Sequence, residues 1–198
     1  MRHEIRLQGA AFALRPVELS DARLIVALRT DGDRTRFLHP TPPSIQAQEE
    51  FLERYFAREG DYYFVVERRD SHVPEGLISV YDIDSGARCG EWGRWVVRSG
   101  SLAAVESVLL IFRAAFEVLD LEMVYSRTLV QNERVVSFHE SCGLETHAVL
   151  PRYTRIGGEQ HDAIEHRLTR ARWPQIEPGL RAHADRIARL LGRTAATS

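Results

Sequence analysis

The stretch that decides the fold is residues 91–143, EWGRWVVRSGSLAAVESVLLIFRAAFEVLDLEMVYSRTLVQNERVVSFHESCG. Its pattern predicts a strand over 91–97, a turn, an apolar helix over 102–121, a strand over 122–130 and a helix after Asn132. Two strands joined by a helix of this length are expected to be parallel neighbours with a right-handed crossover.

The turn before the long helix carries Ser99, Gly100 and Ser101. The first N–H groups of a helix have no partner within the helix, and the helix dipole is positive at this end. The turn is therefore a suitable place to hold a phosphate. Apolar residues recur at three- and four-residue steps along the helix, which predicts burial against a sheet.

The remaining elements extend this unit into a larger sheet. Strands are predicted over 12–16, 62–67, 77–83, 145–150 and 163–168, and helices over 21–30, 45–59 and 179–192. The predicted fold class is α/β with a mixed sheet, in the order β-α-α-β-β-β-α-β-α-β-β. Trp173-Pro174 marks a boundary, so we expect a main domain over 1–172 and a C-terminal amphipathic helix with a frayed tail over 173–198.

Composition excludes several classes of protein. The 198 residues are 44% hydrophobic with a net charge of −2, which suits one globular domain and gives no basic surface for nucleic acid. No apolar run approaches the roughly 20 residues that cross a bilayer, and Glu4 and Arg6 make the N-terminus a poor signal peptide. The two cysteines, Cys89 and Cys142, favour a reducing cytoplasm over a disulfide framework. The C-terminal helix permits a homodimer without requiring one.

The order of elements over about 12–169 resembles the GNAT superfamily of acyl-CoA-dependent N-acyltransferases. The most specific part is AAFEVLDLEMVYSRTLVQNERVVSFHESCGLE, residues 114–145. It is most similar to the branch with the ribosomal-protein alanine acetyltransferases and amino-sugar acetyltransferases. Three positions depart from the family pattern. Leu102 stands at a usual glycine of the phosphate loop, His139 at the usual tyrosine, and Leu144 at the usual phenylalanine.

The resemblance implies acetyl-CoA as co-substrate and no metal. It places the coenzyme where the strand ending at Val97 diverges from the strand ending near Val130. The backbone of Trp95, Val96 and Val97 would bind the pantetheine arm, and Asn132 would hydrogen-bond along it. The diphosphate would lie on N–H groups of the loop, which consists of Ser99, Gly100, Ser101, Leu102, Ala103 and Ala104.

His139 and Glu91 are the candidate catalytic residues. His139 coincides with the position of the family's general acid, and an unperturbed imidazole, with a pKa of about 6.5, donates a proton near neutrality. The competing interpretation is a partly buried histidine on a helix edge. Glu91 is the candidate base, directly or through water, and its competing interpretation is an exposed carboxylate at a strand start.

The amine acceptor is expected to enter over the first helix–helix loop and the last hairpin. The candidate residues are Arg36, Phe37, His39, Arg152 and Tyr153 on the loops, with Tyr81 and Trp92 as walls. The competing interpretation makes the former solvated loop residues and the aromatic strand residues part of the core. A small-molecule amine, an amino sugar and a peptide N-terminus all remain open as acceptors.

Other chemistries have less support. Alternation puts His161 and His166 on opposite faces of a strand, which argues against a metal site with Asp162. Ser137 and His139 are two residues apart on a helix and do not face each other. The sequence lacks a Walker loop and a dinucleotide fingerprint. The alternative function is a catalytically inactive GNAT-like domain that binds a ligand or partner, because the Leu102 side chain could keep phosphate from the loop.

Overall fold

A computed structural model describes residues 2–32, 37, 38 and 40–195. The described chain forms an eight-stranded mixed sheet in the order β1-β2-β3-β4-β5-β6-β8-β7. The strands are β1 (Leu7–Gln8), β2 (Phe12–Pro16), β3 (Tyr62–Arg68), β4 (Pro74–Asp84), β5 (Cys89–Val97), β6 (Met123–Leu129), β7 (Glu145–Ile156) and β8 (Glu159–Thr169). The helices are η1 (Leu19–Asp21), α1 (Ala22–Arg29), α2 (Ile45–Phe56), α3 (Ala104–Arg113), a π-helical turn η3 (Ala114–Val118), α4 (Glu133–Ser141) and α5 (Trp173–Ala195).

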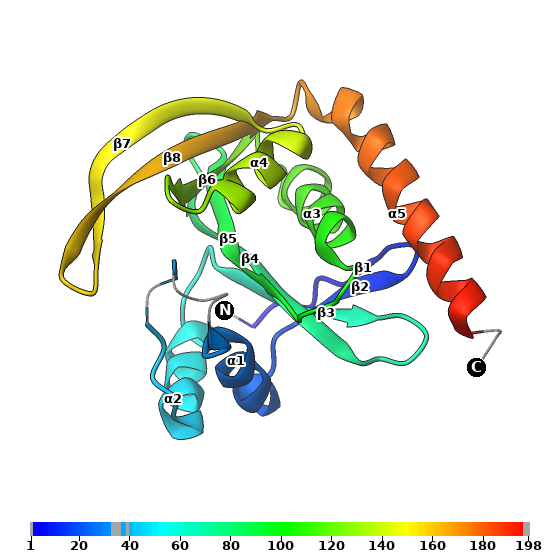
Figure 1. The fold of residues 1–198 in the computed structure, drawn as a ribbon, viewed down its shortest axis with the longest axis horizontal. Coiled ribbons are helices and arrows are strands. Elements are labelled where there is room, and N and C mark those ends of the chain that lie inside the picture. Colours follow the sequence, from blue (N-terminus) through cyan, green and yellow to red (C-terminus); the bar gives the residue numbers. More distant parts are fainter. Residues whose placement is uncertain (1, 33–36, 39, 196–198) are drawn as a thin grey trace.

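Helices cover both faces of the sheet (Figure 1). Tyr63 and Val65 of β3 pack with α1 and α2 in one apolar cluster. Phe64 and Val66, one residue further along the strand, pack with α3 and α5 in the other. This alternation follows from the pleat, which sends successive side chains to opposite faces. The run YYFVVE (62–67) is continuously apolar at its centre because both faces of this strand are buried.

The predicted order of elements and the mixed α/β class are confirmed. The structure adds the short edge strand β1 and lengthens the last hairpin, β7–β8, which curves away from the body of the molecule (Figure 1). It also starts the last helix at Trp173 and not at 179. Pro174 lies in the first turn, where a missing N–H costs nothing, whereas Pro178 lies inside the helix, where it removes the bond to the carbonyl of residue 174 and its ring crowds that carbonyl.

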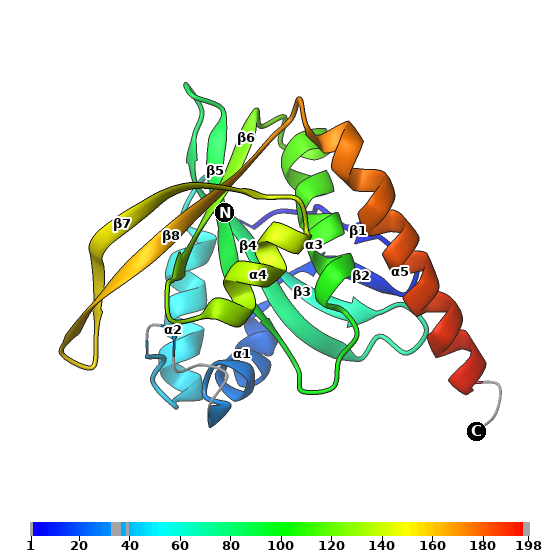
Figure 2. The same ribbon diagram turned by 45° about the horizontal axis from the view of Figure 1, so that its top comes forward.

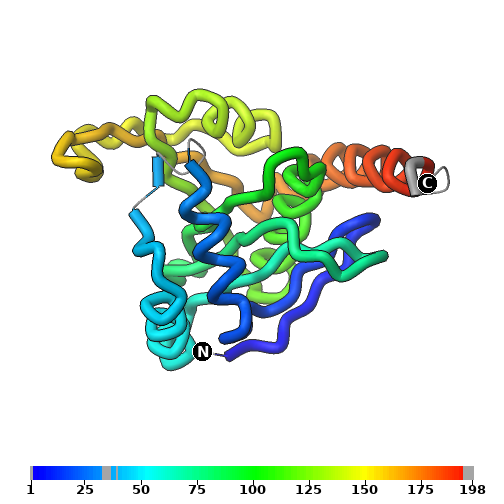
Figure 3. The backbone as a smooth tube through the Cα atoms, turned by 60° about the horizontal axis from the view of Figure 1, so that its bottom comes forward, coloured from blue at the N-terminus to red at the C-terminus, as the bar shows by residue number. Residues whose placement is uncertain are grey.

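The helix α5 packs on the domain. Trp173, Leu180 and Ala184 are buried in the same apolar cluster as α3. Arg113 of α3 donates to Glu177 of α5 over 2.7 Å. In Figures 1 and 3 the far end of α5 and the tip of the β7–β8 hairpin lie at opposite ends of the molecule.

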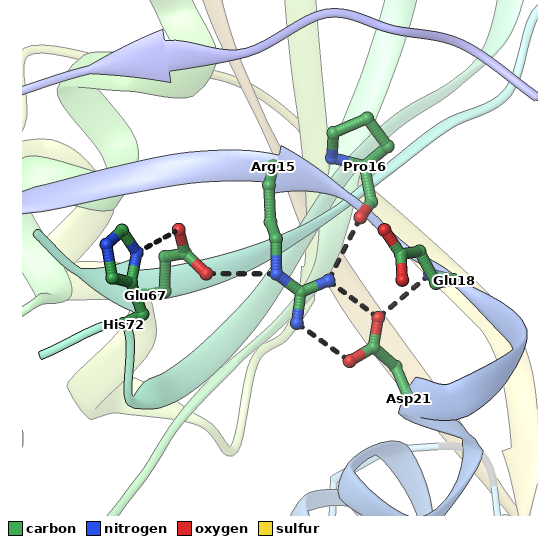
Figure 4. A network of polar contacts seen from close by, with 6 residues as sticks. All are labelled: Arg15, Pro16, Glu18, Asp21, Glu67 and His72. Atoms are coloured by element: carbon green, nitrogen blue, oxygen red, sulfur yellow. Dashed lines mark hydrogen bonds and ion pairs between the residues drawn. The ribbon is translucent and has the colours of Figure 1, made fainter.

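One charge network fixes the start of α1 against the sheet (Figure 4). Arg15 of β2 donates two hydrogen bonds to Asp21, of 2.7 and 2.8 Å, and one of 2.9 Å to Glu67 of β3. Asp21 also accepts the N–H of Glu18. These partners satisfy a largely buried guanidinium, so the cluster holds β2, η1 and β3 together.

Candidate active site

The parallel strands β5 and β6 separate in the middle of the sheet. They pair only at Cys89–Met123, Gly90–Val124 and Glu91–Tyr125. Beyond Glu91 the strand β5 continues to Val97, and β6 continues to Leu129, with no ladder between them. This is the divergence that the resemblance implied.

A bulge in β5 shapes one side of this opening. The partner of Gly93 is Ser79 and the partner of Val96 is Leu77, so β5 holds one residue more than β4 over this interval. Arg94 adopts φ +47° there. The extra residue turns Trp92 and Trp95 to the same face, where the Trp92 ring meets Phe112 of α3 and the Trp95 indole N–H donates to Ser107 of α3 over 3.1 Å.

A cavity of about 250 Å³ opens where the strands part. Its lining comes from α1, β4, β5, β6, α4 and β7, with Phe37 and Leu38. The lining includes both candidate catalytic residues, Glu91 and His139, and Asn132 at the start of α4. These three residues, far apart in the sequence, are thus brought to one cavity.

Glu91 lies at the residue where the two strands separate, and it is buried. Burial raises the pKa of its carboxyl, and the hydrogen bond from Tyr81 opposes this shift. The Tyr81 hydroxyl donates to Glu91 over 3.0 Å, and Arg127 donates to the other carboxylate oxygen over 3.2 Å. A carboxylate with a raised pKa is a stronger base than a solvated one, which suits Glu91 to accept a proton.

Arg127 of β6 joins two carboxylates at the cavity. It donates to Glu91 and, over 3.0 Å, to Glu165 of β8. Its guanidinium also lies 4.7 Å from the ring centroid of Tyr125. The sequence analysis missed this residue, although a charged residue inside the strand VYSRTL (124–129) was the signal that could have found it.

His139 of α4 is buried, and so it is not the partly buried histidine of a helix edge. It is 4% exposed, and its ring centroid lies 4.7 Å from Trp92 and 5.6 Å from His166. Its Nδ1 atom is 3.2 Å from the Ser126 hydroxyl. Burial, with a smaller contribution from His166, lowers the pKa of His139 to about 3. Desolvation disfavours the charged form, so this burial argues against an imidazolium at neutral pH, and the catalytic role of His139 stays a prediction.

The loop before α3 leaves several N–H groups available. Ser101 and Ala103 are engaged within the loop, by Arg98 O and Ser101 Oγ respectively. Within the described chain, the N–H groups of Gly100, Leu102 and Ala104 have no hydrogen-bond acceptor. The Leu102 side chain is 40% exposed. The loop thus retains the donors expected for a diphosphate, with Leu102 directed partly into solvent.

Only some of the residues expected to contact the amine acceptor line the cavity. Phe37, Tyr81, Trp92 and Tyr153 line the cavity, although Trp92 is 1% exposed and also belongs to the core. Arg152, next to Tyr153 in the irregular part of β7, does not line it, and its backbone N–H donates to Asp162 of β8 over 2.7 Å. Arg36 and His39 lie outside the described residues. The lining residues that the sequence analysis missed include Arg29, Arg94, Thr154 and Ile156.

Other types of site find no support in the described part of the chain. Among the described residues, no group of three or more His, Cys, Asp or Glu side chains is placed so that it could hold a metal ion. No helix among the described residues has the length and apolarity needed to span a membrane. Cys142 is buried, and burial raises the pKa of its thiol to about 12, which argues against a nucleophile.

Comparison with solved structures finds acetyltransferases. Apo FdhC, described as a nucleotide-linked sugar GNAT, is 26% identical with a TM-score of 0.74 over 87% of this chain and 94% of its own. A variant of the spermidine N-acetyltransferase SpeG from Vibrio cholerae is 21% identical, with a TM-score of 0.74 over 83% and 97%. A GCN5-related N-acetyltransferase from Brucella melitensis is 20% identical, with a TM-score of 0.80 over 91% and 85%. The last two show the fold alone.

Comparison with curated protein sequences gives no significant match. The family described as acetyltransferase (GNAT) domain matches residues 12–145, which contain the diverging strands, the loop before α3 and both candidate catalytic residues. The chain belongs to the GNAT family of acetyltransferases.

Proposed function

We propose that this protein transfers an acetyl group from acetyl-CoA to a primary amine in the cytoplasm. The observation that carries the proposal is the separation of β5 from β6 after Glu91, beside a loop with unused N–H donors. The unpaired edge of β5 offers backbone groups to the pantetheine arm, and Gly100, Leu102 and Ala104 offer N–H groups to the diphosphate. Asn132 lines the same cavity.

In the proposed reaction the amine nitrogen attacks the thioester carbonyl carbon, the C–S bond breaks, and an amide and a free thiol form. Glu91 takes the proton that the amine loses, directly or through water. His139, neutral because of its burial, hydrogen-bonds the departing sulfur through a ring N–H and does not act as an imidazolium. The proton held by Glu91 then passes, directly or through water, to the leaving thiolate, which gives the free thiol and restores the carboxylate.

The acceptor is a primary amine of a small molecule, an amino sugar or a peptide N-terminus, entering between α1 and β7. Arg29, Arg94 and Arg127 line this side with Glu91. Arg94 is paired with Asp61, and Arg127 with Glu91 and Glu165. These pairs neutralise most of the positive charge, so the lining accommodates a neutral amine and selects weakly by charge.

The test combines binding with turnover. Calorimetry with acetyl-CoA is expected to show binding, and an assay of thiol release with a panel of amines is expected to identify an acceptor. Glu91→Gln should retain binding and lose turnover. Binding without turnover for every amine class would support the alternative of an inactive ligand-binding domain. The exposed position of Leu102 weakens that alternative, because its side chain does not have to cover the loop.

A further inference from the structure

A second hollow lies beside the loop, outside the catalytic cavity. This groove of about 660 Å³ is bounded by the first turn of α3, the end of α4 and one face of α5. In Figures 1 and 2, α3 lies between α4 and α5. Val105 lines the groove and directly follows Ala104, whose N–H is one of the proposed diphosphate donors.

The catalytic cavity and the groove share a wall. The rings of Trp95 and Phe138 stack with centroids 4.8 Å apart and planes at 13°. Trp95 lines the cavity and Phe138 lines the groove. A ligand that runs from the cavity past the loop before α3 therefore reaches the groove on the other side of this stack.

The charge of the groove comes from α5. Gly179, His183 and Arg186 are spaced at four and three residues and lie along the same face of this helix. Gly179 has no atom within 4 Å of the position of a Cβ, so this face is open there. The lining holds two basic side chains, His183 and Arg186, and no carboxylate. Among the described residues neither basic side chain has an ion-pair partner.

The geometry points to the groove as the site of the adenosine 3′-phosphate of coenzyme A, with Arg186 of α5 as its cationic partner and a ring N–H of His183 as a further hydrogen-bond donor. This inference rests on the proposed function. In coenzyme A the 3′-phosphate is one ribose away from the diphosphate, so a diphosphate on the loop brings it beside Val105. A guanidinium matches a phosphate in charge and in hydrogen-bond geometry. The C-terminal helix would then be part of the coenzyme site.

The probe that isolates this contact is 3′-dephospho-coenzyme A, which lacks only the phosphate in question. By calorimetry, the wild-type protein is expected to bind coenzyme A about 10-fold more tightly than the dephospho form. Arg186→Gln should remove most of that preference by weakening coenzyme A alone. His183→Gln should act in the same direction. Arg189→Gln is the matched control, because Arg189 is exposed on α5 and does not line the groove.

The outcomes separate the two proposals. Equal affinity of the wild type for both ligands, or an equal loss for both in Arg186→Gln, overturns the assignment of the groove and leaves the proposed function intact. A wild-type protein that binds neither ligand overturns the proposed function itself. A loss confined to coenzyme A, with Arg189→Gln like wild type, supports the assignment.

Discussion

The Tyr81 hydroxyl donates a hydrogen bond of 3.0 Å to the Glu91 carboxylate at the point where β5 leaves β6. Two opposing effects meet in this contact. Burial raises the pKa of Glu91, and the Tyr81 hydrogen bond lowers it because it favours the ionised form. A carboxylate must be ionised to take a proton from an amine. The fall of kcat/KM at low pH should therefore follow the pKa of Glu91.

We predict that Tyr81→Phe moves the acid limb of kcat/KM to higher pH. Without the hydroxyl, the effect of burial is less opposed and the pKa of Glu91 rises further. The measurement is the rate of thiol release across the pH range. Tyr62→Phe, on β3 and outside the cavity lining, is the control that should leave the limb in place. An unchanged limb in Tyr81→Phe would remove Glu91 from the proton transfer.

His139 variants should separate binding from turnover. His139→Ala removes the proposed donor to the leaving sulfur, and kcat should fall about 100-fold. The KM for acetyl-CoA should change little. His139→Gln retains an N–H on a side chain that fits the site and should keep more activity than His139→Ala. His139→Tyr restores the residue usual in the family, but its larger ring must fit at a buried position beside Trp92 and His166, so this variant should lose stability.

The exposed His147 provides the control for these variants, since His147→Gln should behave as wild type. Equal rates for His139→Ala and wild type would exclude His139 from the reaction. A rise in KM without a fall in kcat would reassign it to coenzyme binding.

The sequence predicted the fold well where local patterns decide it. The apolar run of 62–67 and the helix after the Ser/Gly turn are set by burial on a pleated strand and by three- and four-residue spacing. The site was harder to predict, because the bulge at Arg94 changes which residues share a face and is not visible in a period of two. The pKa of His139 depends on packing by Trp92 and His166, which come from two other strands.

Burial of His3, His139 and His166, which lowers the pKa of each, should make the protein sensitive to acid. The pKa of His139 is about 3 and that of His166 is also lowered, so the unfolded chain binds more protons below about pH 6.5. The contribution of these histidines to the free energy of unfolding should therefore be largest above pH 6.5 and fall as the pH drops toward 3. Each buried histidine contributes a slope of up to about 1.4 kcal/mol per pH unit.

Urea denaturation at about pH 7 and about pH 5 measures this slope. His139→Gln lacks the titrating ring, so its free energy of unfolding should fall less between the two pH values than that of wild type. His147→Gln, at an exposed position, should keep the wild-type slope. Parallel curves for wild type and His139→Gln would show that His139 is solvated in the folded protein.

Two substitutions in the loop before α3 should differ in their effect on the KM for acetyl-CoA. Leu102→Gly removes a side chain that is 40% exposed, so the KM for acetyl-CoA should change less than about threefold. Gly100 has φ +76°, so Gly100→Ala strains the loop by about 1 kcal/mol and should raise KM by displacing its N–H donors. Steady-state kinetics measures both. A large gain in affinity from Leu102→Gly would show that the leucine obstructs the coenzyme.

Arg94 combines a bulge, an ion pair and two aromatic contacts. Its guanidinium donates to both oxygens of Asp61, over 2.6 and 3.0 Å, and lies 4.3 Å from the ring centroid of Tyr81. Asp61 is 7% exposed. Removing one partner of a buried pair leaves an uncompensated charge, which costs more than removing both.

We therefore predict that Asp61→Asn and Arg94→Gln each lower the free energy of unfolding by about 3 kcal/mol, and that the double variant loses less than their sum. A double-mutant cycle in urea measures the coupling. Arg58→Gln, an exposed arginine near the end of α2, is the control. Because the pair holds the bulge that turns Trp92 and Trp95 toward α3, kcat should fall in both single variants. Additive losses would mean that the ion pair does not stabilise the bulge.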